Sequence, residues 1–219
     1  MRGNFLAGFS AALGIALLLG APAGPGKAHA RKDQMIYVTN SDADTVSVID
    51  RASRKVVRTF PVGDYPHHIL RSPDGKQLFI GNTQSDSLTV VDLETHKPVG
   101  IIRNILDPYN FIFDPAKRFM VVSGTRLGFV LVYDAATMKL IHRVPTGREP
   151  NHMIFSKDGR LFFVTNEKSR SVSVLDTVNW KLKEQIIVGE RPVDIILSPD
   201  SGEIFVALYG EGKVAVLDA

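Results

Sequence analysis

Cysteine is absent from all 219 residues of the sequence. Its absence excludes disulfide bonds, iron–sulfur clusters, thiolate zinc sites and covalently attached c-type haem. The folded chain must therefore be held together by side-chain packing and hydrogen bonds. A bound metal ion would have to use nitrogen and oxygen donors.

The sequence also lacks a marked excess of charge of either sign. The formal net charge is +3, from 26 Lys and Arg against 23 Asp and Glu. Arg2 and Lys27 lie in an N-terminal segment that we expect to be removed, which leaves a balance of +1. Such a balance gives no electrostatic footprint for nucleic acid, so we expect no nucleic-acid partner.

Motifs of the common enzyme classes are missing as well. The sequence contains no nucleophile elbow, phosphate-binding loop, glycine-rich dinucleotide fingerprint or zinc-protease helix motif. No residue is therefore assigned a catalytic role, and a protein that is not an enzyme is favoured. The sequence requires no cofactor, and a divalent metal ion is the one candidate.

Charge is absent from residues 3–26, which follow Arg2. Residues 5–20 form an apolar run, and Ala28-His29-Ala30 fits the small-x-small rule for signal peptidase. Residues 1–30 are thus predicted to be a signal peptide, which places the mature chain in the periplasm or outside the cell without a stable membrane span. The alternative is an uncleaved anchor, although the run is short and glycine-rich for a spanning helix.

A 42-residue internal repeat fills the remainder of the chain. Four sets of positions keep this spacing in one register, which chance does not explain. They are Asp50, Asp92, Asp134, Asp176 and Asp218; Pro66, Pro108, Pro150 and Pro192; Ser72, Asp114, Ser156 and Ser198; and Lys55, Lys97, Lys139 and Lys181. The repeated Asp residues precede turns, so we interpret them as turn formers.

Each unit is predicted to fold as four short β-strands. In residues 66–107, alternating apolar segments such as Leu88–Val91 are separated by turn sequences such as Ser72-Pro73-Asp74-Gly75. Four strands in about 40 residues are typical of one blade of a β-propeller. The sequence therefore predicts an all-β propeller over residues 31–219, with units near 35–65, 66–107, 108–149, 150–191 and 192–219.

Tyr37-Val38-Thr39-Asn40 and the following Thr45–Asp50 resemble the YVTN family of β-propeller repeats. Phe163-Val164-Thr165-Asn166 is a later copy of the same motif. The resemblance covers nearly all of residues 35–219 and implies a secreted or periplasmic propeller. Similar propellers form surface layers, accompany quinone-dependent dehydrogenases or bind haem in nitrite reductases, so the fold alone does not choose a function.

The repeat does not supply a complete ring. The first unit begins at the equivalent of a second strand, and the last ends after its third, so we expect an open arc of about five blades. A longer parent protein or closure by a partner chain would explain it. We expect the bare faces of the end blades to carry Val46, Val48, Phe205, Val214 and Val216 and to promote self-association.

The residues that follow the repeated Pro are the candidate ligand-binding residues. His68, Asn110, His152 and Asp194 are spaced by one repeat unit and begin the predicted innermost strands, and His67 adjoins them. At the mouth of the central channel these side chains could bind an anionic ligand or, through His68, His152 and Asp194, a divalent metal ion. The alternative is that polar residues simply line a solvated channel.

Three roles remain open from the sequence. The first is a non-catalytic binding or scaffold module with a protein or small-molecule partner. The second is a redox-accessory or metal-handling propeller that uses the histidines at the channel mouth. The third is a structural component of the cell envelope. Trp180, at the start of an outer strand, is expected to be partly buried or to form an exposed contact.

Overall fold

The computed structural model describes residues 35–200 and 202–218. The predicted signal peptide, residues 1–30, lies outside the described residues. The compact unit Gln34–Ala219 is considered by itself. Its elements are β1 (Met35–Asn40), a 3-10 turn η1 (Ser41–Ala43), β2 (Thr45–Asp50), β3 (Lys55–Pro61), β4 (Pro66–Arg71), β5 (Gln77–Asn82), β6 (Ser87–Asp92), β7 (Lys97–Arg103), β8 (Pro108–Phe113), β9 (Phe119–Gly124), β10 (Phe129–Asp134), β11 (Leu140–Pro145), β12 (Pro150–Phe155), β13 (Leu161–Asn166), β14 (Ser171–Asp176), β15 (Lys181–Ile187), β16 (Pro192–Leu197), β17 (Glu203–Leu208) and β18 (Lys213–Asp218).

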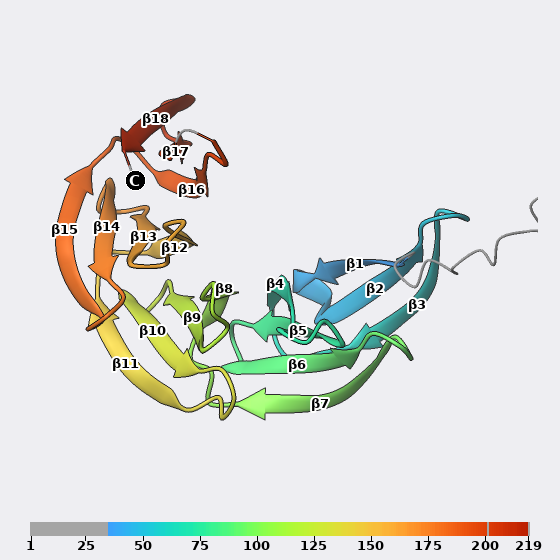
Figure 1. Cartoon of the computed structure of the whole chain (residues 1–219). Helices are drawn as coiled ribbons and strands as arrows, with labels where there is room; N and C mark the ends of the chain where they lie inside the picture. The colour runs from blue at the N-terminus through green and yellow to red at the C-terminus, as the bar shows by residue number, and fades with distance from the viewer. Residues whose placement is uncertain (1–34, 201, 219) are drawn as a thin grey trace, which may run out of the picture. The chain divides into compact units, whose positions relative to one another are not determined.

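The strands form five antiparallel sheets that follow one another along the chain. The sheets are β1-β2-β3, β4-β5-β6-β7, β8-β9-β10-β11, β12-β13-β14-β15 and β16-β17-β18. The first sheet lacks its inner strand and the last lacks its outer strand, as the repeat register predicts. In the described part of the chain the sheets form an open arc of propeller blades (Figure 1).

The innermost strands pack against one another from blade to blade. β4 contacts β8, β8 contacts β12, and β12 contacts β16. Pro66, Pro108, Pro150 and Pro192 begin these four strands, so every inner strand starts at the same edge of the arc. The hairpin between the second and third strands lies at this edge too, because Pro150 is paired with Asn166 at the end of β13.

Each of these hairpins contains one residue with a left-handed backbone conformation, and this requirement explains which amino acids occur at that position of the repeat. Asp44, Asp86 and Arg170 have φ values of 52°, 46° and 56°, and the equivalent positions in the other two blades are Gly128 and Gly212. Glycine adopts this conformation without steric cost, whereas other residues do so only when the surrounding structure holds them there. The repeated Asp and Gly positions are thus hairpin formers.

The side chain of the Asn in the YVTN motif stabilises the same hairpin through hydrogen bonds. The Nδ2 of Asn166 donates to the Oγ atoms of Ser171 (3.3 Å) and Ser173 (2.9 Å), and its Oδ1 accepts the N–H of Gly147 (3.0 Å). Asn40 and Asn82 make the same pair of side-chain contacts, five and seven residues further along the chain. The motif therefore encodes a hairpin rather than a ligand site.

The core lies between neighbouring sheets rather than inside a single layer. Trp180, between β14 and β15, is 5% exposed and packs against Phe119 of the third sheet and Phe162 of its own. The side chain of Trp180 is more deeply buried than the sequence predicts. The residues at the equivalent positions of the other blades, Arg54, His96 and Met138, are exposed or only partly buried. One indole therefore joins two blades.

The bare faces of the end sheets differ from the expectation at two positions. Val46 and Val48 are fully buried against Leu78, Ile80 and Val91 of the second sheet, so their assignment to the bare face is wrong. β2 alternates, and its apolar positions face the next blade while Ser47 faces outward. The bare face of the first sheet instead carries Ile36 and Val38 of β1, which are 48% and 41% exposed.

The last sheet agrees with the expectation. Val214 and Val216 are 60% and 51% exposed. Their register places them opposite Ala207 and Phe205, on the same outward face. No helix in the described residues is long and apolar enough to cross a membrane.

Candidate functional site

The site at the start of the inner strands is built around two histidines from different blades. The Nε2 atoms of His68 on β4 and His152 on β12 lie 3.3 Å apart, and their rings meet edge to face at a centroid distance of 5.1 Å. The residues are 84 positions apart in the sequence, or two repeat units. The structure thus brings these two side chains together.

A backbone carbonyl from the following blade fixes each imidazole. The Nδ1 of His68 lies 2.5 Å from the carbonyl oxygen of Tyr109, and the Nδ1 of His152 lies 2.7 Å from that of Val193. A carbonyl oxygen only accepts, so we assign the proton of each neutral ring to Nδ1. The Nε2 atoms that face each other then both carry lone pairs.

Asn151 supports this assignment at His152. Its Oδ1 lies 2.8 Å from the Nδ1 of His152, while its Nδ2 donates to the Oε2 of Glu167 at 3.3 Å. The contact with the carboxylate orients the amide so that its oxygen faces the imidazole. Two acceptors therefore surround the Nδ1–H of His152.

His67 and Tyr109 complete the aromatic part of the site. The ring of His67 stacks on that of Tyr109 with a centroid distance of 4.1 Å and an interplanar angle of 27°. The Nδ1 of His67 also lies 2.8 Å from the Nδ1 of His68. Three imidazoles and a phenol thus share one partly buried cluster.

Burial governs the protonation of this cluster. It lowers the pKa of His68 to about 4, assisted by the positive charges that His67 and His152 would carry, and opposed by the Tyr109 carbonyl and Asp194. Burial, followed by repulsion from His152, also lowers the pKa of His67. Neutral imidazoles are the form that binds metal ions.

The other two predicted site residues take different places. Asn110 on β8 is buried. Asp194 on β16 is exposed, and its Oδ1 accepts the N–H of Ile195. Among the described residues, no three His, Cys, Asp or Glu side chains are grouped closely enough to hold a metal ion. The histidines therefore meet as a pair, with Asp194 near enough only for its charge to be felt.

The sequence analysis missed Tyr109, Asn151 and Glu167. His67, Tyr109, Asn151 and Val193 are themselves spaced by 42 residues, one position before the column of His68. This second column could have been found from the repeat. The members of this column contribute differently: Val193 acts through its backbone carbonyl, His67 and Asn151 act through their side chains, and Tyr109 acts through both.

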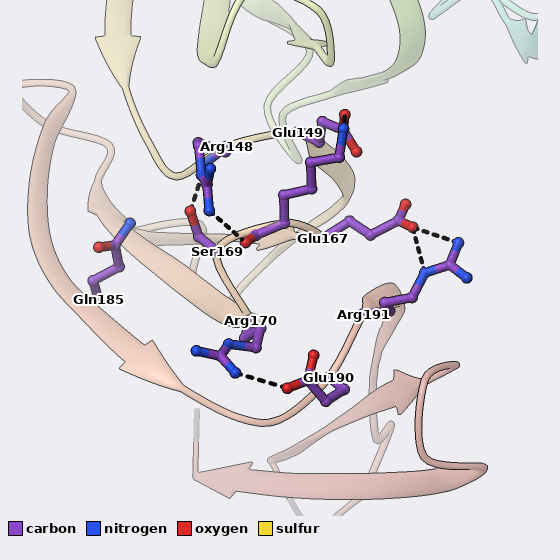
Figure 2. Close-up of a pocket in the computed structure, with 9 residues that line it drawn as sticks. Arg148, Glu149, Glu167, Ser169, Arg170, Gln185, Glu190 and Arg191 are labelled. Atoms are coloured by element: carbon purple, nitrogen blue, oxygen red, sulfur yellow. Dashed lines mark hydrogen bonds and ion pairs between the residues drawn. The ribbon is translucent and has the colours of Figure 1, made fainter.

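A charged pocket of about 750 Å³ is lined by residues of the fourth blade and of the segments that lead to β12 and β16 (Figure 2). Arg170 donates to Glu190 at 2.7 Å, and Arg191 donates to Glu167 at 2.9 and 2.7 Å. The remaining lining residues are Arg148, Glu149, Lys168, Ser169 and Gln185. Because Glu167 also contacts Asn151, hydrogen bonds connect the pocket with His152.

The residue before each repeated Pro has a left-handed backbone. Tyr65, Asp107, Glu149 and Arg191 have φ values between 45° and 54°. Such non-glycine conformations cost free energy and cluster at functional sites. Asp107 is the most buried of the four; burial raises its pKa, while its hydrogen bonds and ion pair with Arg126 lower it. The same conformation recurs at the outer turns, in Arg54, His96, Met138 and Trp180, so it is a property of the repeat and does not single out this edge.

The family model of the YNCE-like β-propellers matches residues 7–219 of this chain. The chain belongs to this family. The match agrees with the YVTN-type repeats read from the sequence. No curated protein sequence matches the chain.

Solved structures resemble this YNCE-like propeller in fold. They include hydrazine synthase of Kuenenia stuttgartiensis, at 21% identity and a TM-score of 0.68, and a putative 6-phosphogluconolactonase from Bacteroides fragilis, at 16% identity and a TM-score of 0.72. A mitotic checkpoint complex matches at 15% identity and a TM-score of 0.70, over 59% of the matched chain. The first two alignments cover 84% of this chain and 63% of the matched chains, so the YNCE-like propeller spans less than two thirds of their length. At such identities the likeness shows the fold alone.

Proposed function

We propose that this YNCE-like propeller is an exported, non-catalytic binding module whose ligand site is the edge where the inner strands begin. The observation that carries the proposal is the meeting of His68 and His152 from different blades. Side chains far apart in sequence converge there with stacked rings and partly desolvated polar groups, which is typical of small-molecule sites. A structural envelope role needs no such cluster.

The binding role can be tested by mapping small molecules onto the isotope-labelled protein. Phosphate, citrate, gluconate and glycine betaine serve as organic and anionic probes, and NMR shift changes are expected at residues 67–68, 109 and 151–152. Tyr109→Ala removes the stacked ring beside His67 and should weaken these changes, whereas Val178→Ala, in the exposed turn between β14 and β15, should not. Shift changes confined to the outer strands would contradict the proposal.

The proposal that the protein is not an enzyme can be tested separately. A putative lactonase is among the similar folds, so hydrolysis of gluconolactone and its 6-phosphate provides the relevant assay. We expect rates at the level of the uncatalysed reaction. Turnover that depends on His68 or His152 would make the protein an enzyme.

Export follows from the predicted signal peptide. Expression in a Gram-negative host should give a periplasmic protein that begins at Arg31 or a near neighbour, as read by N-terminal sequencing. An intact Met1 form in the membrane fraction would favour the uncleaved anchor instead.

A metal-handling or redox-accessory role is the second candidate. It is favoured by one observation, the two Nε2 lone pairs that face each other at 3.3 Å. The ligand set proposed from the sequence, His68, His152 and Asp194, is reduced to the two histidines in this second candidate, because among the described residues no three such side chains are grouped closely enough to hold a metal ion.

A further inference from the structure

The facing Nε2 atoms of His68 and His152 create an electrostatic conflict. Each Nδ1 is committed to a backbone carbonyl of the next blade, at 2.5 and 2.7 Å, and therefore carries the proton of its neutral ring. Two lone pairs 3.3 Å apart then point at each other. Such an arrangement is unfavourable unless the two nitrogens share a proton or a metal ion.

The separation of the two nitrogens indicates which cation fits. A proton shared between the two nitrogens would make a long and therefore weak hydrogen bond at this distance. Two imidazole nitrogens bound at about 2.0–2.1 Å in a tetrahedral zinc site lie about 3.3 Å apart. The observed 3.3 Å equals the separation of two neighbouring ligand atoms on a tetrahedral metal ion.

We propose that His68 and His152 form a two-histidine site for a divalent transition-metal ion of the zinc and copper class. The proposal rests on the binding role of this edge and names the chemistry of its ligand. Imidazole suits these metals, whereas magnesium and calcium prefer oxygen donors. The Tyr109 and Val193 carbonyls act as outer partners that fix the ring orientation and increase the basicity of the ligating nitrogens.

Two histidines supply only part of the coordination sphere of a metal ion. Among the described residues no third His, Cys, Asp or Glu joins the pair. The Nδ1 of His67 faces the Nδ1 of His68 rather than the pair of Nε2 atoms. A bound ion would thus keep coordination positions open for water or for an anionic ligand that enters from solvent, as metal sites with an open position do.

The test uses zinc alone as the probe, added to the purified mature chain. Isothermal titration and metal analysis after dialysis should give about one zinc ion per chain. His68→Phe and His152→Phe preserve an aromatic ring but remove Nε2, and each should weaken zinc binding at least tenfold. Circular dichroism verifies that the variants keep their β-structure, and His152→Gln provides a second variant if the Phe side chain disturbs folding.

Two controls make the result specific. His142→Phe changes an exposed histidine on β11, and Asp194→Asn changes a carboxylate whose charge acts on His68; both should bind zinc within about twofold of the unaltered chain. Cobalt(II) should give the intense visible absorption of a tetrahedral site in the unaltered chain and lose it in His68→Phe.

Two outcomes would overturn the metal site. One is no stoichiometric zinc binding by the unaltered chain, and the other is equal binding by the His68→Phe and His152→Phe variants. If zinc does not bind while the organic probes still shift the resonances of residues 67–68 and 151–152, the proposed metal site is refuted and the proposed binding role stands. If neither zinc nor any probe acts at this edge, both are wrong.

Discussion

His68 and Tyr109 are joined by the same contact as His152 and Val193, two repeat units later. In each case the imidazole Nδ1 lies against the backbone carbonyl of the residue 41 positions further along, at 2.5 and 2.7 Å. The contact is part of the interface between consecutive inner strands. The repeat therefore fixes the orientation of both imidazoles, and their meeting follows from the geometry of the arc.

The first prediction concerns Trp180, whose indole joins the third and fourth blades. Trp180→Ala would remove a buried aromatic side chain and should lower the free energy of unfolding by about 3–5 kcal/mol. Its Nε1 is buried without a hydrogen-bond partner, so Trp180→Phe loses no hydrogen bond. The Phe variant should therefore cost only about 1–2 kcal/mol. Urea denaturation followed by circular dichroism measures both, and equal losses would refute the packing role.

The second prediction concerns the Asn of the hairpin motif. Asn166→Asp keeps the shape of a fully buried side chain but removes the N–H groups that contact Ser171 and Ser173. We expect a loss of at least about 2 kcal/mol, because burying a charge costs more than the Gly147 N–H and the two serine hydroxyls can compensate. Asn40 makes the same contacts in a partly exposed hairpin and provides the matched control. Asn40→Asp should cost less than half as much in the same urea titration.

The third prediction concerns acid stability. The hydroxyl and N–H of Thr137 lower the pKa of the Asp134 carboxyl in the folded state. A carboxyl whose pKa is lower in the folded than in the unfolded chain stabilises the fold above its unfolded pKa. That stability is lost as the pH falls through the folded pKa. The free energy of unfolding should therefore decrease as the pH falls below about 4, starting near the ordinary value of 3.8.

Two variants of Thr137 separate this effect from general acid unfolding. Thr137→Val removes the hydroxyl donor and should reduce the dependence of stability on pH between about 4 and 2. Thr137→Ser keeps the donor and should behave like the unaltered chain. Urea titrations across this pH range provide the measurement. Identical pH dependence in the Val and Ser variants would show that the hydroxyl has no such role.

The sequence predicts the blades better than it predicts the site. A strict repeat places His68, Asn110, His152 and Asp194 at one edge because equivalent positions of equivalent strands must lie together. It does not say which side chains meet, since that depends on ring orientation and on hydrogen bonds with the neighbouring blade. The assignment of Val46 to a bare face failed for a related reason: alternation defines two faces of a strand but not which one meets the next blade.

The outward faces of the first and last sheets are the remaining surface that the fold leaves uncovered. Val214 and Val216 on β18 and Ile196 on β16 are more than half exposed, and their register places them on one face with Phe205. A hollow of about 130 Å³ lies on this face beside Val214. Contiguous apolar patches of blade size are typical of interfaces rather than of monomers.

The last prediction is that the mature chain associates with itself through these faces. Burial of apolar surface contributes about 25 cal/mol per Å², so covering a patch of several hundred Å² favours association before entropic costs are subtracted. Val214→Lys combined with Val216→Lys places two charges on the face and should shift the protein toward monomer in sedimentation velocity at micromolar concentration. Val178→Lys, at an 83% exposed turn position outside the sheets, is the matched control and should leave the distribution unchanged. A monomeric unaltered chain at these concentrations, with a single cooperative melt, would mean that exposure of this face is tolerated and that no second copy covers it.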